Sequence, residues 1–181
     1  MGNIHVVETP TGLKNTSPLD SERIEQYKSF LRGLIEQASH YANQNAVPFE
    51  DLREIQNKRI ALDPHMQDNP KVKAISEALC TVCKGGCCTS GRNKAYLSVM
   101  TIRRFMDIHP AFTPEDVLNS YLSLLSPSTI GNSCINQTKK GCGLPRDMRS
   151  DICNGYFCES IVVYHKHDGK TDKSHSVLAI Q

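Results

Sequence analysis

Hydrophobic residues recur at helical spacing in five stretches of the chain, and the longest stretch covers residues 17–45. It opens with Ser17 as a cap, Pro18 at the first helical position and Asp20 three residues after the cap. Its apolar residues form one stripe: Ile24, Tyr27, Leu31, Leu34, Ile35, Ala38, Tyr41 and Ala42. This pattern predicts a long amphipathic helix.

The other four stretches predict shorter helices. They cover residues 48–62, 69–80, 98–110 and 113–125. The helix over 69–80 would carry Val72, Ile75 and Leu79 on one face and end at Cys80. Thr113 and Asp116 form a capping box at the start of the last one.

The C-terminal residues follow a different pattern. Residues 160–166 and 176–181 are rich in β-branched and apolar residues and flank the turn-forming stretch 167–173, which predicts a short β-hairpin. The whole chain is then mainly α, with N-terminal helices packed on a cysteine-rich section. We expect a flexible tail at 1–16, a helical section at 17–68, a cysteine-cluster section at 69–160 and the hairpin within 161–181, all in one compact domain.

Composition indicates a soluble cytoplasmic protein. The chain has 181 residues, of which 39% are hydrophobic and 22% charged, as one ordinary domain requires. Its first twenty residues lack the basic start and apolar run of a secretory signal. No apolar run approaches the roughly 20 residues that span a bilayer, so we expect no membrane partner.

That compartment changes the interpretation of the eight cysteines. Disulfides seldom persist in a reducing cytosol, where clustered cysteines more often bind metal or do redox chemistry. Cys80 and Cys83 have the two-residue gap with which a tight turn lets two thiolates hold one ion. Gly85 and Gly86 would allow backbone amides to approach the sulfurs.

The remaining cysteines extend the candidate site. Cys87 and Cys88 are adjacent, so their side chains tend to point apart, and the later cysteines have no standard zinc-knuckle spacing. Such spacing also suits an iron-sulfur cluster, which needs only thiolates converging from the fold. Eight thiolates could build two sites, a shared binuclear site, or one site with spare cysteines. The candidate metal ligands are Cys80, Cys83, Cys87, Cys88, Cys134, Cys142, Cys153 and Cys158.

Other roles for these cysteines rank lower. A single free cysteine is more often a small buried hydrophobe, but four within nine positions favour ligation of zinc or iron. A redox thiol comes second and a disulfide last. His165 and His167 would share a face of the predicted strand, with His175 opposite, as supplementary ligands.

Charge around the cysteines supports the same order. Residues 80–149 contain nine Lys or Arg and four Asp or Glu, a surplus of five positive charges. A basic shell would stabilise deprotonated sulfur. Nucleic-acid binding could explain the same surplus. It ranks lower because the net charge is only +2 and tryptophan is absent.

Two segments resemble the YkgJ-type cysteine-cluster family of zinc- or iron-chelating domains. The first, CTVCKGGCC at 80–88, is similar to the family's two spaced cysteines followed by a doublet. The second, from Cys134 to Cys153, looks like its downstream Cys, Arg and closing Cys. Three residues, Lys84, Gly85 and Gly86, separate Cys83 from the doublet, which is one more than the family usually has. Likewise, Ser150 stands where the family commonly has proline.

The resemblance implies metal binding and no assigned reaction. One related branch, the flagellin lysine methylases, uses an iron-sulfur cluster with S-adenosylmethionine, so an enzyme of that kind is the alternative function. The chain lacks a glycine-rich loop after a strand that would position this cofactor. An interaction module that binds nucleic acid is the third alternative, and no protein partner is indicated.

Overall fold

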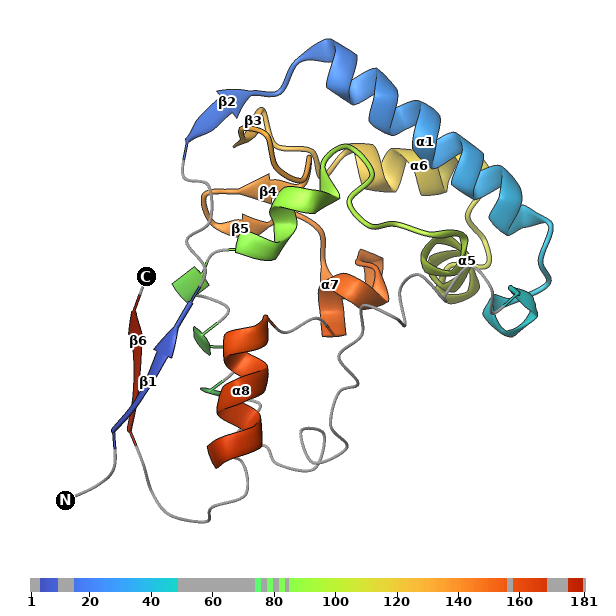
Figure 1. Cartoon of the computed structure of the whole chain (residues 1–181). Coiled ribbons are helices and arrows are strands. Elements are labelled where there is room, and N and C mark those ends of the chain that lie inside the picture. Colours follow the sequence, from blue (N-terminus) through green and yellow to red (C-terminus); the bar gives the residue numbers. More distant parts are fainter. Residues whose placement is uncertain are drawn as a thin grey trace.

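Helices dominate the computed structural model, as the mainly α prediction requires (Figure 1). The structure describes residues 4–9, 15–48, 74–75, 78–79, 82–83, 85–155, 158–168 and 176–180. In chain order the elements are β1 (Ile4–Glu8), β2 (Thr16–Pro18), α1 (Ser21–Ser39), η1 (Gln44–Ala46), η3 (Gly86–Gly91), α5 (Val99–Ile108), α6 (Pro114–Leu122), β3 (Ser128–Ile130), β4 (Gln137–Thr138), β5 (Gly141–Cys142), η4 (Arg146–Met148), α7 (Asp151–Gly155), α8 (Glu159–Asp168) and β6 (Ser176–Ile180).

The main core lies between α1, α5 and α6. The predicted stripe of α1 supplies five buried residues: Tyr27, Leu31, Leu34, Ile35 and Ala38. They pack in one cluster with buried residues of α5, of α6 and of the segment 134–148. Burying these apolar side chains is the main stabilising contribution to this part of the fold.

Local signals place the helix ends. The side chain of Ser98 accepts a hydrogen bond from the N–H of Thr101 at the start of α5. Thr113 and Asp116 form the predicted capping box of α6. The start of α1 is a correction, because Asp20 caps this helix and Ser17 does not. Ser17 instead lies in β2, which pairs antiparallel with β3, so strand pairing wins over the local capping pattern.

The predicted C-terminal hairpin is wrong. Residues 159–168 form α8, and β6 pairs in parallel with β1 at the other end of the chain. Ile161 and Tyr164 are one helical turn apart and pack with Val7 of β1, so tertiary packing overrides the strand preference of a β-branched run. The strand in which His165 and His167 would share a face is therefore not formed, and His175 lies outside the described residues.

The N-terminal segment also differs from the prediction of a flexible tail. Residues 4–8 form β1, and Thr16 begins β2. The predicted helix at 48–62 lies outside the described residues apart from Pro48, and in the helix at 69–80 only residues 74–75 and 78–79 are described, all helical. None of the helices in the described ranges has the length and apolarity needed to cross a bilayer.

Candidate metal centre

A tight turn at Gly85 begins the cysteine-rich part of the described chain. Gly85 has φ of +87°, and an added Cβ would lie 2.9 Å from the sulfur of Cys88 and 3.0 Å from Nε2 of Gln137. The N–H of Cys88 donates to the Gly85 carbonyl over 2.9 Å. Glycine is therefore required for both its backbone conformation and its lack of a side chain.

Cys83 lies just before this turn and is buried. Its sulfur accepts a hydrogen bond from the N–H of Gly86 over 3.2 Å. Backbone N–H groups that point at sulfur stabilise thiolate ligands. This is the close approach of a backbone amide to sulfur that Gly85 and Gly86 predict. Cys80, its predicted partner, lies outside the described residues.

The segment that carries Cys134 is bonded to the turn of η3. The N–H of Cys134 donates to the Cys88 carbonyl over 3.1 Å. A Cβ on Gly91 would lie 3.2 Å from the Cβ of Cys134, so the two segments touch. These contacts bring together two cysteines that are 46 residues apart in sequence.

Gln137 connects the same two segments from the interior. It is buried, its Nε2 donates to the Gly85 carbonyl over 3.1 Å, and its Oε1 accepts a hydrogen bond from Ser133. In the β4–β5 pair it also stands opposite Cys142. The side chain of Gln137 therefore holds the turn at Gly85 against the β4–β5 hairpin, which carries Cys142.

Cys153 reaches the site from α7. The Ser150 hydroxyl accepts from its N–H over 3.2 Å, and its sulfur donates to the Ala95 carbonyl over 3.8 Å. Arg104 of α5 holds this helix through Asp151, at 2.5 Å, and through the Arg149 carbonyl, at 2.7 Å. The position of Cys153 is thus set by the helical core.

Electrostatic coupling shows that five thiols share one neighbourhood. Burial is the largest cause that raises the pKa of Cys134, to about 12, and Cys142 and Cys153 raise it further. Although Cys153 is exposed as a residue, desolvation of its thiol raises its pKa, and Cys142 and Cys87 add to this. We call these five residues the thiol cluster: Cys87, Cys88, Cys134, Cys142 and Cys153.

The adjacent cysteines in this cluster are unequal. The hydrogen bond between them lowers the pKa of Cys87 to about 7, and it is also the largest cause that raises the pKa of Cys88. Burial and the nearby Cys134 and Cys153 raise the pKa of Cys88 further. Cys87 is the exposed member, so the more acidic thiol is also the more accessible one.

The chain adopts a strained path beside the cluster. Arg92, Ala95 and Tyr96 all have positive φ, at 39°, 50° and 56°. Each non-glycine residue in this region costs on the order of 1–2 kcal/mol. The path brings the Tyr96 hydroxyl to the Cys87 carbonyl, at 3.2 Å, and the Ala95 carbonyl to Cys153.

Two arginines provide positive charge near the thiols. Arg23 lowers the pKa of Cys134, and Arg149 lowers that of Cys153, although burial outweighs both effects. Arg149 belongs to the predicted basic surplus, whereas Arg23 lies on α1 and was missed. Its guanidinium donates to Asn93 (2.6 Å), Thr129 (3.2 Å) and the Ser133 carbonyl (2.6 Å). No local signal near the cysteines indicates a residue so distant in sequence.

Cys158 lies in another part of the molecule. It is partly buried and packs on a small cluster formed by Val7, Leu79, Ile161 and Tyr164, which we call the second core. Of the eight predicted ligands, the structure brings five together, places Cys83 before the turn and places Cys158 in the second core. Cys80 lies outside the residues that the structure describes.

The donor set fits a thiophilic metal chemically, because zinc and iron-sulfur clusters are held by thiolates. Among the described residues, however, no three Cys, His, Asp or Glu side chains are arranged closely enough to hold a metal ion. The five thiols are therefore neighbours that would have to move closer together to become ligands of one ion.

Comparisons with protein-family models, curated proteins and solved structures return no match. The resemblance to the YkgJ-type family therefore rests on the two cysteine motifs alone.

Proposed function

We propose that this chain binds zinc or iron, the latter as an ion or as an iron-sulfur cluster, through its clustered cysteines. The observation that carries the proposal is the convergence of the thiol cluster from four segments: η3, the segment of Cys134, β5 and α7. Five free thiols gathered in this way exceed what a core needs for packing, since a single cysteine serves there as a small hydrophobe.

The electrostatics of the cluster favour a cation. Burial raises the pKa of Cys134, and neighbouring thiols raise it further because two thiolates repel. At Cys88 the hydrogen bond with Cys87 is the largest cause, and burial and nearby thiols add to it. A bound divalent ion reverses this balance and holds the thiols deprotonated. Arg23 and Arg149 would offset the negative charge that a thiolate site retains.

The ligands would come from the thiol cluster, with Cys80 and Cys83 as further candidates from the segment just before it. Closing the site needs the segment around Cys153 to approach the segments that carry Cys88 and Cys142. The turn at Gly85 and the β4–β5 hairpin are joined through Gln137, so these two parts would move as one unit.

Anaerobic purification with metal and sulfide analysis tests the proposal. We expect close to one equivalent of zinc or of iron per chain, or about two to four iron with a similar amount of sulfide where a cluster is bound. Cys142→Ser and Cys153→Ser should each lower this content, because both residues belong to the thiol cluster. Cys158→Ser is the matched control and should keep the metal, since Cys158 packs in the second core.

The same preparation separates the alternatives. Brown protein that contains sulfide and consumes S-adenosylmethionine would favour the methylase-like enzyme. Protein that takes up neither zinc nor iron when reconstituted under reducing conditions would refute metal binding and favour a redox role for the thiols. Equal loss of metal in all three variants would show only a folding effect and would refute the assignment of ligands to the thiol cluster.

A further inference from the structure

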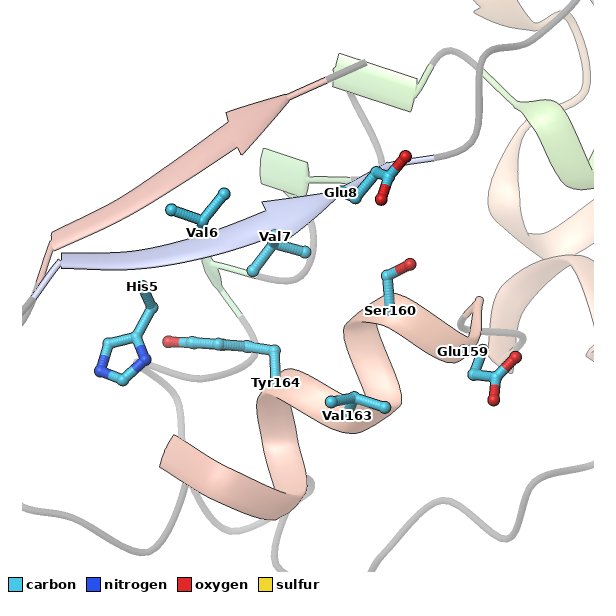
Figure 2. Close-up of a pocket in the computed structure, with 8 residues that line it drawn as sticks. All are labelled: His5, Val6, Val7, Glu8, Glu159, Ser160, Val163 and Tyr164. Carbon is cyan, nitrogen blue, oxygen red and sulfur yellow. The ribbon is translucent and has the colours of Figure 1, made fainter.

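A groove lies between β1 and α8, and β6 lies on the other side of β1 (Figure 2). Its cavity has a volume of about 480 Å³, within the range of roughly 300–1,000 Å³ that ligand sites occupy. The walls include His5, Val7 and Glu8 from the strand and Glu159, Val163 and Tyr164 from the helix. None of the thiol cluster lines it.

The backbone of β1 is open along this groove. The N–H of Thr9 donates to the Ile180 carbonyl over 2.8 Å, so Thr9 points toward β6. Successive residues of a strand direct their backbone groups to opposite edges, so those of Val6 and Glu8 point away from β6. Within the described ranges β1 pairs with β6 alone, and neither residue has another backbone partner.

Charge at the groove is one-sided. Glu8 and Glu159 lie toward the same end (Figure 2), and the described residues that line the groove include neither Lys nor Arg. In the part of the chain that the structure describes, neither carboxylate has an ion pair. A basic side chain would complement this end, whereas Val7, Val163 and Tyr164 offer apolar contact further along.

The outer face of the two-stranded sheet adds a second apolar surface. Ile4 is 66% exposed, Val6 59% and Leu178 52%. A strand added beside β1 would place alternate side chains next to Val6 on this face and the others over the groove. The unpaired backbone groups favour an extended peptide over a compact small molecule, because a peptide can satisfy them in register.

We propose that the open edge of β1 is a docking site for an extended peptide of a partner protein, one that alternates aliphatic side chains and carries a basic residue beside Glu8 and Glu159. Main-chain hydrogen bonds to Val6 and Glu8 give affinity, and the groove gives specificity, as in other cases of strand addition. This inference is independent of metal binding.

A panel of synthetic peptides tests the site by fluorescence polarisation with the full chain. Each peptide has eight residues that alternate valine and threonine, with one lysine moved through the positions. We expect saturable binding that depends on the position of the lysine and is lost when alternate residues are replaced by proline. No binding by any member up to 1 mM, or equal binding of the proline peptides, would overturn the proposal.

Variants locate the site. Val6→Pro removes the outward N–H while sparing the bonds to β6, and should weaken binding about tenfold. Glu8→Lys should weaken it at least about fivefold at low salt, whereas Glu36→Lys on the exposed face of α1 is the matched control and should not. Unchanged binding in both edge variants would refute the location, with circular dichroism and urea unfolding confirming that they fold.

Light scattering distinguishes a partner peptide from a second copy of this chain as the occupant of the β1 edge. A dimer that Val6→Pro converts to monomer would identify a second copy of this chain at the edge and would overturn the claim of a partner peptide.

Discussion

Replacing Gly85 by alanine tests the turn that begins the thiol cluster. At φ of +87° the substitution puts a side chain in the left-handed region, which costs about 1–2 kcal/mol. The new Cβ would also lie 2.9 Å from the sulfur of Cys88 and 3.0 Å from the Gln137 amide. Forcing these two neighbours apart costs about a further 1–3 kcal/mol. We therefore expect Gly85→Ala to lose about 2–5 kcal/mol of unfolding free energy.

Two other glycines separate the cost of the backbone conformation from the cost of the steric contacts. Gly141 has φ of +109°, but its added Cβ would meet nothing within 4 Å, so Gly141→Ala should lose only the backbone cost of about 1–2 kcal/mol. Gly33 lies inside α1 with nothing within 4 Å of an added Cβ. Gly33→Ala should therefore stabilise the chain by about 0.5–1 kcal/mol.

Urea unfolding of the reduced, chelator-treated chain measures the three changes by linear extrapolation at constant slope. The expected order of stability is Gly33→Ala, wild type, Gly141→Ala, Gly85→Ala. If Gly85→Ala is no less stable than Gly141→Ala, the close approach of Cys88 and Gln137 to this turn is not present. Loss of stability in Gly33→Ala would refute the backbone argument itself.

Three further outcomes follow from individual contacts. In the metal-free chain the hydrogen bond from Cys88 lowers the pKa of Cys87 to about 7, so alkylation of Cys87, followed by peptide mass spectrometry, should have its midpoint near pH 7, and Cys88→Ala should move it upward. Asp116 accepts hydrogen bonds from the hydroxyl and N–H of Thr113, which lower its pKa, so the stability it contributes is complete above about pH 4 and is lost as the pH falls through the lowered value. The Tm difference between wild type and Asp116→Asn should therefore shrink between pH 6 and pH 2; a difference that does not depend on pH would contradict this. The buried Tyr121 hydroxyl donates to a main-chain carbonyl of η4 over 3.1 Å, so Tyr121→Phe should lose about 1–2 kcal/mol by urea unfolding, and no loss would show that water satisfies that carbonyl.

The parts of the fold that could be predicted from sequence are those with local causes. The stripe of α1 and the capping box of α6 depend on residues three or four positions apart, and both are confirmed. Ser17 failed as a cap because Thr16–Pro18 pairs with Ser128–Ile130, more than 100 residues away. Residues 159–168 became a helix because Val7 offers Ile161 and Tyr164 a packing surface.

The candidate site shows the same division. Clustering of the thiols near Cys87 was visible in the sequence, but the choice among the distant cysteines was not. Cys134 joins the thiol cluster through a backbone hydrogen bond to Cys88. Cys158 directly precedes α8 and packs with this helix in the second core. Spacing along the chain carries no information about such contacts.

The contacts of Arg23 explain why the thiol cluster depends on the helical core. Its guanidinium reaches from α1 to Asn93, beside the strained path at 92–96, and to Ser133, next to Cys134. On the other side, Arg104 of α5 fixes the helix that carries Cys153. The segments of the cluster are short turns with little regular structure, so their relative positions follow from these two arginines and from Gln137. A metal ion that drew the thiols together would therefore act on a preformed neighbourhood, and would add its binding energy to contacts that α1 and α5 already hold.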